Sequence, residues 1–531
     1  GFKMIHRILV LSFAALCLLD PVFGEGVTFE MQQQWLVIAN GVISSAHSSE
    51  IDAQTAAVAQ KEALPTGYVA ITQQMMQVAT LSEDIPTPNP VLASTPAPTP
   101  NPTPNPITAS TLAPTPNPTP NPAPASTPAP TPNPVTASTP APTPLFVNGD
   151  LVWGYDATPL STTLTKPNLY QNYVDPAYNT VIRRVTSAQG TRFDRNTYSR
   201  RQPENSDGAM FFTYHGSAAY HVYTRTTGAL VRALGIHPDA EPQWHPTDSN
   251  LIRFIEGPNS YVGDLILFEV NVVTGVSYAL ADLTERIRQD FPDADYMKDR
   301  AEGSPSANGS RYAWLVYNTA EVIIGLVSYD LVTDTVLGTL AVSQFPANAG
   351  SLDWVSTSPS GQYVMGGFGE GTYVFNADFT NERYVGPSEH SDMAIGSNGN
   401  DFYCYINFDN GWLTAVDLTT LQSSQIFDLY DNANTSIHIS GKGYNKPGWV
   451  VASTYSCKVE FAWSCYKVMA VEMVPNGRVL NLAHTYNCGD DYWTETQAAV
   501  NRDFTRVYFN SDGFSCGIDA EVYLIDVPDF N

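Results

Sequence analysis

Histidine, carboxylate and lysine side chains recur in short polar stretches of the C-terminal part of the chain. The candidates of this kind are Glu241, His245, Asp353, His390, Asp392, His438 and Lys442. Imidazoles and carboxylates are ligands for divalent metals, and they also transfer protons as general acids and bases. A polar, hydrated channel without catalysis is the third interpretation. Any of these chemistries requires a fold that brings the residues to one place.

Residues 145–531 have the pattern of an all-β domain. Short runs of Val, Ile, Tyr and Phe alternate with turns rich in Gly, Asn, Asp and Pro. A longer unit also repeats, at roughly the 40–60-residue spacing of four-stranded propeller blades. Each unit opens with a polar stretch, and the β runs after these openings are 209–214, 251–255, 312–317, 363–368, 401–406, 449–454 and 506–510.

This period predicts a seven-bladed β-propeller. A β-solenoid and a pair of sandwiches are the alternative folds, and the uneven spacing argues against the solenoid. In a propeller the innermost strands line a central channel, so the polar openings are expected to converge there. Residues 181–185 precede the first unit, and we expect them to close the ring by pairing with the last blade.

A hairpin of the form strand, D-x-x-T-G, strand repeats through the domain. It occurs at 223–228 (YTRTTG), 270–275 (VNVVTG), 329–334 (YDLVTD) and 416–421 (VDLTTL). Together with the turn Ser358-Pro-Ser-Gly, it resembles the TolB-like and oligogalacturonate-lyase-like propellers. This resemblance covers about 145–531, and it is informative for architecture but weak for activity.

Two segments, His390-Ser-Asp and His438-Ile-Ser, look like the later blades of secreted propeller polysaccharide lyases of the oligogalacturonate and ulvan types. The resemblance implies β-elimination next to a uronate. The candidate catalytic residues are then His390, His438 and His245, and the candidate substrate-binding residues are Asp392, Lys442 and Trp493. Tyr214-His215 and Tyr220-His221 form a second region that could supply a base.

The match to the lyases is incomplete. The metal-binding oligogalacturonate lyases use several histidines and a glutamine, and the sequence identifies neither a Gln partner nor an Arg that would neutralise the substrate's acid group. A divalent metal in the channel remains open, with its ligands unknown. Trp463 and Trp493 lie near loops, where they would either stack on sugar rings or pack inside a blade.

A proline-rich stalk occupies residues 86–144. Repeats such as VLASTPAPTPNPTPNP contain no charged and no aromatic residue, and they hold more than half of the chain's 40 prolines. Alternating proline favours polyproline II, a semi-rigid spacer on the order of 180 Å long if fully extended. The composition resembles hydroxyproline-rich glycoproteins, which implies hydroxylation and O-glycans at Thr95, Pro96, Thr99, Pro100, Thr103, Pro104, Thr115, Pro116, Thr119 and Pro120. An unmodified linker is the alternative.

Residues 1–24 have the features of a signal peptide: a basic start, a short apolar run and a small residue at the end. An N-terminal anchor is the alternative. No later run is long and apolar enough to span a membrane. Residues 25–85 form a small segment that we interpret as an assembly element or a poorly ordered leader. Within it, 51–64 and 68–81 have helical spacing, and 35–38 fits a helix face or a strand.

Cysteine use agrees with export. Cys17 would leave with the signal peptide, and we expect Cys457 to pair with Cys465 and Cys488 with Cys516. Cys404 would then remain as a buried thiol in a strand. Sequons for N-glycosylation occur at Asn308 and Asn434, in predicted loops.

A formal net charge of −26 repels phosphates and anionic lipid, so neither nucleic acid nor a membrane surface is expected as a partner. The leading hypothesis is a secreted, extracellular structural or adhesive glycoprotein that self-associates into a fibre or matrix. The second is a polysaccharide lyase acting on acidic polysaccharide. The third is a non-catalytic, carbohydrate-binding propeller.

Overall fold

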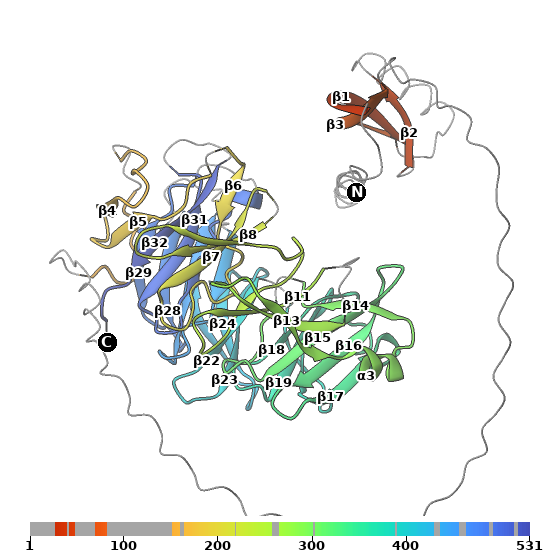
Figure 1. The fold of residues 1–531 in the computed structure, drawn as a ribbon. Helices are drawn as coiled ribbons and strands as arrows, with labels where there is room; N and C mark the ends of the chain where they lie inside the picture. The colour runs from red at the N-terminus through yellow and green to blue at the C-terminus, as the bar shows by residue number, and fades with distance from the viewer. Residues whose placement is uncertain are drawn as a thin grey trace, which may run out of the picture. The chain divides into compact units, whose positions relative to one another are not determined.

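The structure is a computed structural model, and its chain divides into two compact units, 1–130 and 131–531. Figure 1 draws the described elements. The residues that the structure describes are 27–39, 42–47, 69–81, 151–159, 164–188, 190–217, 219–257, 265–300, 303–387, 390–429, 436–455, 463–487, 492–513 and 519–530. The stalk at 86–144 lies outside them.

The first unit contains an antiparallel sheet of three strands in the order β2-β1-β3. They are β1 (Val27–Ala39), β2 (Val42–His47) and β3 (Val69–Leu81). The helix expected over 68–81 is wrong, because β3 pairs with β1 along its whole length. Val, Ile and Thr recur in this strand, and such β-branched residues favour extended structure. Residues 35–38 lie in a strand, whereas 51–64 lie outside the described residues.

The described part of the second unit is a seven-bladed β-propeller. Five blades are separate four-stranded antiparallel sheets, as the sequence period predicted, whereas the strands of the first and last blades join in one nine-stranded sheet through a short parallel pairing. Blade 1 contains β6 (Phe193–Arg195), β7 (Met210–His215), β8 (Ala219–Thr224) and β9 (Leu230–Leu234). Blade 2 contains β10 (Gln243–Trp244), β11 (Leu251–Ile255), β12 (Ile266–Asn271) and β13 (Ser277–Asp282). After α3 (Thr284–Asp290), blade 3 contains β14 (Ala294–Lys298), β15 (Arg311–Asn318), β16 (Ile323–Asp330) and β17 (Thr335–Ala341).

The next three blades repeat the same antiparallel order. Blade 4 contains β18 (Leu352–Thr357), β19 (Tyr363–Phe368), β20 (Gly371–Asn376) and β21 (Arg383–Gly386). Blade 5 contains β22 (Ser391–Ile395), β23 (Asp401–Asn407), β24 (Trp412–Asp417) and β25 (Ser423–Asp428). Blade 6 contains β26 (Ser436–Ser440), β27 (Trp449–Tyr455), β28 (Lys467–Glu472) and β29 (Val479–His484).

The last blade joins the two ends of the domain. Its first three strands are β30 (Ala499–Val500), β31 (Arg506–Ser511) and β32 (Ala520–Asp526). The fourth is β5 (Val181–Arg184), which pairs antiparallel with β32 from Tyr523↔Arg184 to Asp526↔Val181. The short strand β4 (Asn172–Val174) pairs with the other edge of β5. The ring closure expected from 181–185 is therefore confirmed, and Figure 1 shows β5 beside β32.

The repeated hairpins join the third and fourth strands of the blades. In three of them the first Asn or Asp accepts two backbone amides in a side-chain-capped turn: Asn271 from 273 and 274, Asp330 from 332 and 333, and Asp417 from 419 and 420. The turn ends on a residue with positive φ, which is Gly275 at 77° in blade 2. This geometry explains the D-x-x-T-G pattern.

Residues 196–205 run inside the central channel. Asn196 bonds Asn510 and Gln497 of blade 7, Arg200 bonds Ser391 of blade 5, and Gln202 bonds the carbonyl of Lys442 of blade 6. Further partners of this segment are the carbonyl of Pro242, the carboxylate of Asp299, the hydroxyl of Ser304 and the ring of Trp354. A segment that touches all six other blades must occupy the middle of the ring.

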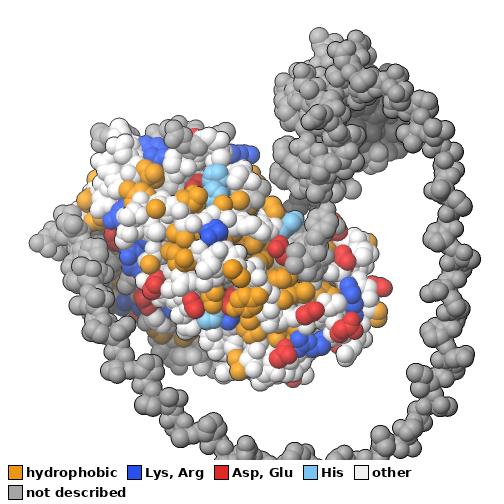
Figure 2. All heavy atoms as spheres, in the orientation of Figure 1, with side chains coloured by type: hydrophobic (Ala, Val, Ile, Leu, Met, Phe, Trp, Pro, Cys, Tyr) orange, Lys and Arg blue, Asp and Glu red, His pale blue; other side chains and the backbone are white. Residues whose placement is uncertain are grey.

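The apolar cores lie between neighbouring blades. Cys404 is fully buried and unpaired, as predicted, with Met473 beside it. Trp463 is also buried, and it packs edge-on against Tyr155 and Phe427, so its blade-packing interpretation is confirmed. On the face in Figure 2, acidic side chains gather over the region of α3 and β16. No helix among the described residues is long and apolar enough to cross a membrane.

Candidate functional site

Two of the predicted catalytic histidines meet at one end of the channel. His390 directly precedes β22 of blade 5, and His438 lies in β26 of blade 6. Their rings stack with centroids 4.8 Å apart and planes 23° apart. Tyr455, at the end of β27, continues the stack at 4.7 Å from His438. We call these three residues the His–Tyr stack.

Hydrogen bonds set the tautomer of each imidazole. Nδ1 of His390 lies 2.6 Å from the carbonyl oxygen of Ile437, so it carries the proton and the lone pair lies on Nε2. Nε2 of His438 lies 3.4 Å from a carboxylate oxygen of Glu495. Its Nδ1 is buried without a hydrogen-bond partner among the described residues.

Burial and positive neighbours keep His438 neutral. Only 2% of this residue is exposed, and burial, followed by the charges of His390, Arg200 and Arg195, lowers its pKa well below the usual value. Burial also raises the pKa of Tyr455, with the nearby Glu495 adding to the shift. The stack therefore holds a neutral imidazole and a protonated phenol at neutral pH.

A buried arginine and an aromatic wall stand beside the stack. Arg195, at the end of β6, lies 4.8 Å from the ring of Trp493 and 5.8 Å from the ring of Tyr492. Trp493 in turn stacks on Phe193 at 4.9 Å. Nη1 of Arg195 donates to Gln497, whereas its Nε is buried without a partner among the described residues. Burial lowers the pKa of this arginine, although Tyr492 and Glu495 oppose the shift.

Asp392 and Lys442 form an ion pair with each other. The ammonium of Lys442 lies 2.8 Å from Asp392, which also accepts the backbone amides of Gly441 and Met393. Burial opposes the charge on Lys442, but Asp392 raises its pKa overall. Both side chains are almost fully buried. The pair thus links blades 5 and 6, and it offers little to a substrate.

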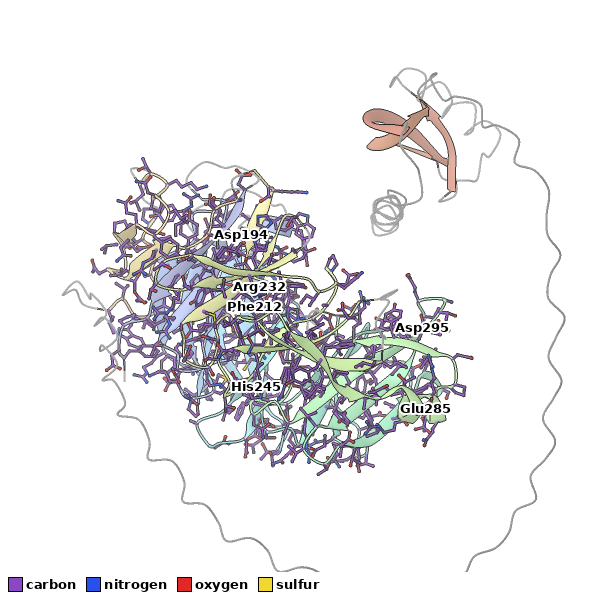
Figure 3. All side chains as sticks on the ribbon, viewed as in Figure 1. Asp194, Phe212, Arg232, His245, Glu285 and Asp295 are labelled. Carbon is purple, nitrogen blue, oxygen red and sulfur yellow. The ribbon has the colours of Figure 1, made fainter. Side chains whose placement is uncertain are left out.

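The structure does not bring His245 to the other histidines. His245 follows the inner strand of its blade, whereas His390 precedes the inner strand of its own, so they lie at opposite ends of the channel. Figure 3 shows Asp194, the neighbour of Arg195, and His245 at two ends of the sheets with Phe212 between them. Asp353 does not reach the stack either, because it forms an exposed pair with Arg300. Glu241 accepts the backbone amide of Asp299.

The second histidine region forms a separate pair in blade 1. His215 and His221 stack at 4.2 Å across β7 and β8. Nδ1 of His221 lies 3.1 Å from the hydroxyl of Tyr223, which itself donates to Asp194. This pair is near neither His390 nor His438 in any described contact.

The described residues provide no set of ligands for the divalent metal considered for the channel. Among the described residues, no group of three or more His, Cys, Asp or Glu side chains is arranged to hold a metal ion.

Sequence reasoning missed the arginine and the glutamine that the structure supplies. Arg195 lies ahead of the first recognised unit, where the short strand β6 gives a weak pattern. Gln497 and Glu495 lie two and four residues before the inner strand β30, and so on the same side of an inner strand as His390 in blade 5. Comparing positions relative to each inner strand would have found them.

The comparisons with known proteins give structural likeness alone. No family model and no curated protein sequence matches the chain. Two solved structures resemble it at a TM-score of 0.48. An oligogalacturonate lyase in complex with manganese has 14% sequence identity, and the match covers 70% of this chain and 97% of the lyase chain. The oligogalacturonate lyase of Vibrio parahaemolyticus has 13% identity, and the match covers 68% of this chain and 96% of the lyase chain. The C-terminal WD40 domain of Sif2 has a TM-score of 0.34 and 12% identity, over 62% and 81%.

Several expectations concern residues outside the described part. Cys465 is disulfide-bonded, but Cys457, Cys488 and Cys516 lie outside it, so the two pairings stay predictions. The same holds for Asn434 and for the O-glycans of the stalk. Asn308 lies exposed in a turn, where its Oδ1 accepts the hydroxyls of Ser306 and Ser310, and its glycosylation stays a prediction. Secretion and self-association stay predictions as well.

Proposed function

We propose that the end of the channel with the His–Tyr stack binds a uronic acid residue and cleaves the adjoining glycosidic bond by β-elimination. The observation that carries the proposal is the stack beside a buried arginine whose Nε has no described partner. A base, a cation for the acid group and a proton donor are the groups that this reaction needs. The neutral His438 and the aromatic wall complete the arrangement.

Arg195 is the residue we assign to the substrate carboxylate. A guanidinium recognises a carboxylate through paired hydrogen bonds, and burial strengthens that contact. Neutralising the carboxylate makes the proton on the adjacent carbon easier to remove. Because burial already lowers the pKa of Arg195, a bound anion would restore the balance of charge around it. Trp493 and Tyr492 would pack against the sugar ring.

His390 is the residue we assign as base. Its Nε2 would take the proton from the carbon next to the carboxylate. The electrons of that C–H bond form the new carbon–carbon double bond, and the bond to the glycosidic oxygen breaks with its electron pair on oxygen. The hydroxyl of Tyr455 lies 3.5 Å from Nδ1 of His390, and we assign it to protonate that oxygen. The products are an unsaturated uronate and a free hydroxyl end.

The test is the ultraviolet absorbance of unsaturated uronate during incubation of the full chain with pectin-derived oligouronates or ulvan. Arg195→Gln and His390→Gln should each lower the rate by on the order of 10². Arg232→Gln and His221→Gln are matched controls, since these residues lie outside the stack. The proposal fails if the folded wild-type chain yields no unsaturated product. Uronate binding without product would instead support the non-catalytic, carbohydrate-binding alternative.

A structural or adhesive role, suggested by the stalk at 86–144, remains a separate prediction. Mass spectrometry of native material would find hydroxyproline and O-glycans on the stalk if it holds. Electron microscopy of the same material would find filaments. Bare proline and single particles would contradict it.

A further inference from the structure

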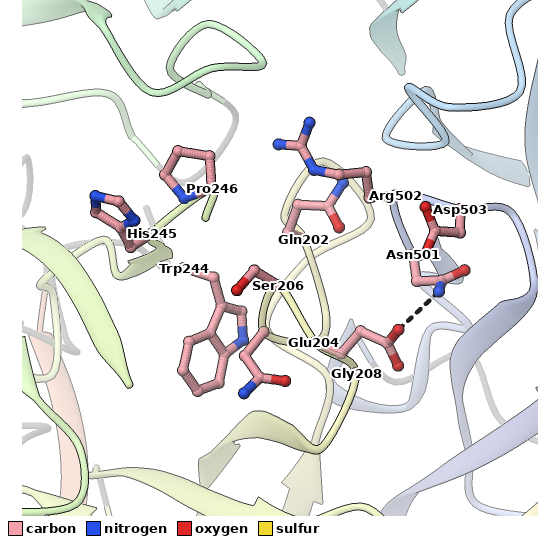
Figure 4. Close-up of a pocket in the computed structure, with 11 residues that line it drawn as sticks. Gln202, Glu204, Ser206, Gly208, Trp244, His245, Pro246, Asn501, Arg502 and Asp503 are labelled. Atoms are coloured by element: carbon pink, nitrogen blue, oxygen red, sulfur yellow. Dashed lines mark hydrogen bonds between the residues drawn. The ribbon is translucent and has the colours of Figure 1, made fainter. Parts of the chain in front are cut away.

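A group of cavities lies at the end of the channel opposite the His–Tyr stack, where loops that follow inner strands meet. The largest has a volume of about 270 Å³, and its lining includes His245, Arg253, Asn308 and Arg502. Two smaller cavities share Pro246 and Arg502 with it. Figure 4 shows one of these, with Arg502 on one side and His245 and Pro246 on the other. Arg502 thus borders all three cavities.

Arg502 carries an uncompensated charge. Among the described residues no carboxylate forms an ion pair with it, although the chain has a formal net charge of −26 and most other arginines of the channel are paired or buried. Its Nη2 donates to the carbonyl of Ala307, and its guanidinium lies 5.1 Å from the ring of Tyr444. These contacts, from blades 3 and 6, hold the guanidinium in place at the cavity wall.

His245 and Arg253 add further donors. Nδ1 of His245 accepts the backbone amides of Thr247 and Asp248, so the proton of the neutral ring lies on Nε2. Burial, with Arg253 adding to it, lowers the pKa of His245, which keeps the ring neutral. Arg253 donates through Nε to Glu269 and through Nη1 to the carbonyl of Gly309. These two bonds fix the orientation of its guanidinium group.

We propose that this cavity binds the acidic group of a monosaccharide-sized ligand, a sugar carboxylate or sulfate. Its charged and imidazole groups are donors, which select an oxyanion over a cation. Drug-sized ligands occupy pockets of roughly 300–1,000 Å³, so a cavity of about 270 Å³ suits one sugar unit. Leu331 and Val332 form an apolar part of its wall, which fits the apolar face of a sugar ring.

The site is independent of the proposed elimination, because it lies at the other end of a channel filled by residues 196–205. The ligand here would be held and released unchanged. An acidic polysaccharide could therefore be retained at one end of the propeller while its cleavable unit is processed at the other.

The test is isothermal titration calorimetry of the full chain with galacturonate, and separately with sulfate, at low ionic strength. Wild type should bind at least one of the two probes, and Arg502→Gln should weaken that binding at least tenfold. Arg232→Gln is the matched control, since Arg232 also donates to backbone carbonyls, those of Val272 and Val273, and borders none of these cavities. Raising the salt concentration should weaken the binding.

Two further variants separate this site from the His–Tyr stack. Arg195→Gln should leave the binding that depends on Arg502 intact. His245→Gln should weaken that binding, and it replaces Arg502→Gln as the test variant if Arg502→Gln fails to fold. The proposal is overturned if wild type binds neither probe, or if Arg502→Gln binds as wild type does. Binding lost in Arg195→Gln but not in Arg502→Gln would also overturn it, while supporting the proposed function.

Discussion

The rings of His390 and His438 stack 4.8 Å apart, joining the inner edges of blades 5 and 6. Two imidazoles at this distance do not readily both become positively charged, because like charges repel in a poorly solvated site. His438 is the more buried of the two, and its pKa is lowered well below the usual value. The stack therefore contains an imidazole, that of His438, which stays neutral.

The neutral His438 makes stability depend on pH. In the unfolded chain a histidine takes up a proton below about pH 6.5, whereas folded His438 does not until a much lower pH. The unfolded state then binds more protons, so the free energy of unfolding should fall as the pH drops below about 6.5, by up to about 1.4 kcal/mol per unit for one proton. Chemical denaturation between pH 7 and 5 measures this slope.

His438→Gln should reduce the dependence of the free energy of unfolding on pH by the contribution of one proton. His221→Gln is the control, because His221 is only partly buried and its pKa is lowered less. If His438→Gln and wild type lose stability in parallel as the pH falls, His438 is not a buried neutral imidazole.

Glu204 holds the channel segment to the last blade. It pairs with Arg506 at 2.8 and 2.6 Å, and it accepts further bonds from Tyr508 and Asn501. Figure 4 shows the bond to Asn501. Removing one partner of a buried pair leaves the other charge uncompensated. Glu204→Ala should lower the free energy of unfolding by about 3–5 kcal/mol, measured by urea denaturation.

Glu370, an exposed residue in the turn after β19, offers a control for this substitution. Glu370→Ala should change the stability by less than about 0.5 kcal/mol. Equal effects of the two substitutions would show that the Glu204 network contributes nothing of its own.

The blades could be predicted from the sequence because their signals are local. Each hairpin has its own turn residues, such as Asn271 and Asp417, and each strand has its own run of Val, Ile and aromatic residues. The prediction of a helix over 68–81 was wrong because this segment combines the apolar spacing of a helix with the composition of a strand. Pairing with β1 decides in favour of the strand. Only long-range pairing, which a single sequence does not contain, resolves such cases.

The site was only partly predictable, for a different reason. His390 and His438 were found because both belong to unit openings. His245 belongs to an opening too, but it lies after its inner strand and so reaches the far end of the channel. Arg195 comes from the short strand β6, ahead of the first recognised unit, and no repeat marks that strand. Periodicity identifies the blades but not the direction in which each opening points.

Ring closure by β5 should be needed for stability. Ile182 in this strand is fully buried in the core between blades 6 and 7. Ile182→Ala should lower the free energy of unfolding by about 2–5 kcal/mol, because it removes packed apolar volume from a closed site. Val174→Ala, in the partly exposed strand β4, is the control and should cost much less. Thermal denaturation followed by circular dichroism compares the two, and equal shifts would contradict a role for β5 in closure.

Lys467 offers a second test of how burial of a charged group affects stability, this time at alkaline pH. Its ammonium lies under residues 151–159 and bonds the carbonyl of Asp156, with Asn481 3.4 Å away. Burial lowers its pKa to about 8, although Asp156 and Asp175 oppose the shift. Between about pH 8 and 10.4 the unfolded chain binds the proton more readily than the folded one. The contribution of Lys467 to the free energy of unfolding should therefore rise with pH across that window, by up to about 3 kcal/mol, and be lost again as the pH returns to 8.

Lys467→Met keeps the length of the side chain and removes the charge. This variant should lack that contribution, so the free energy of unfolding of wild type relative to the variant should rise over the same window in urea denaturation. The variant should match or exceed the stability of wild type at pH 8, because no buried ammonium remains to be desolvated. Lys166→Met is the control, since the ammonium of Lys166 is partly exposed and paired with Glu521 at 2.9 Å. A pH slope in Lys467→Met as steep as that of wild type would show that the proton is taken up elsewhere.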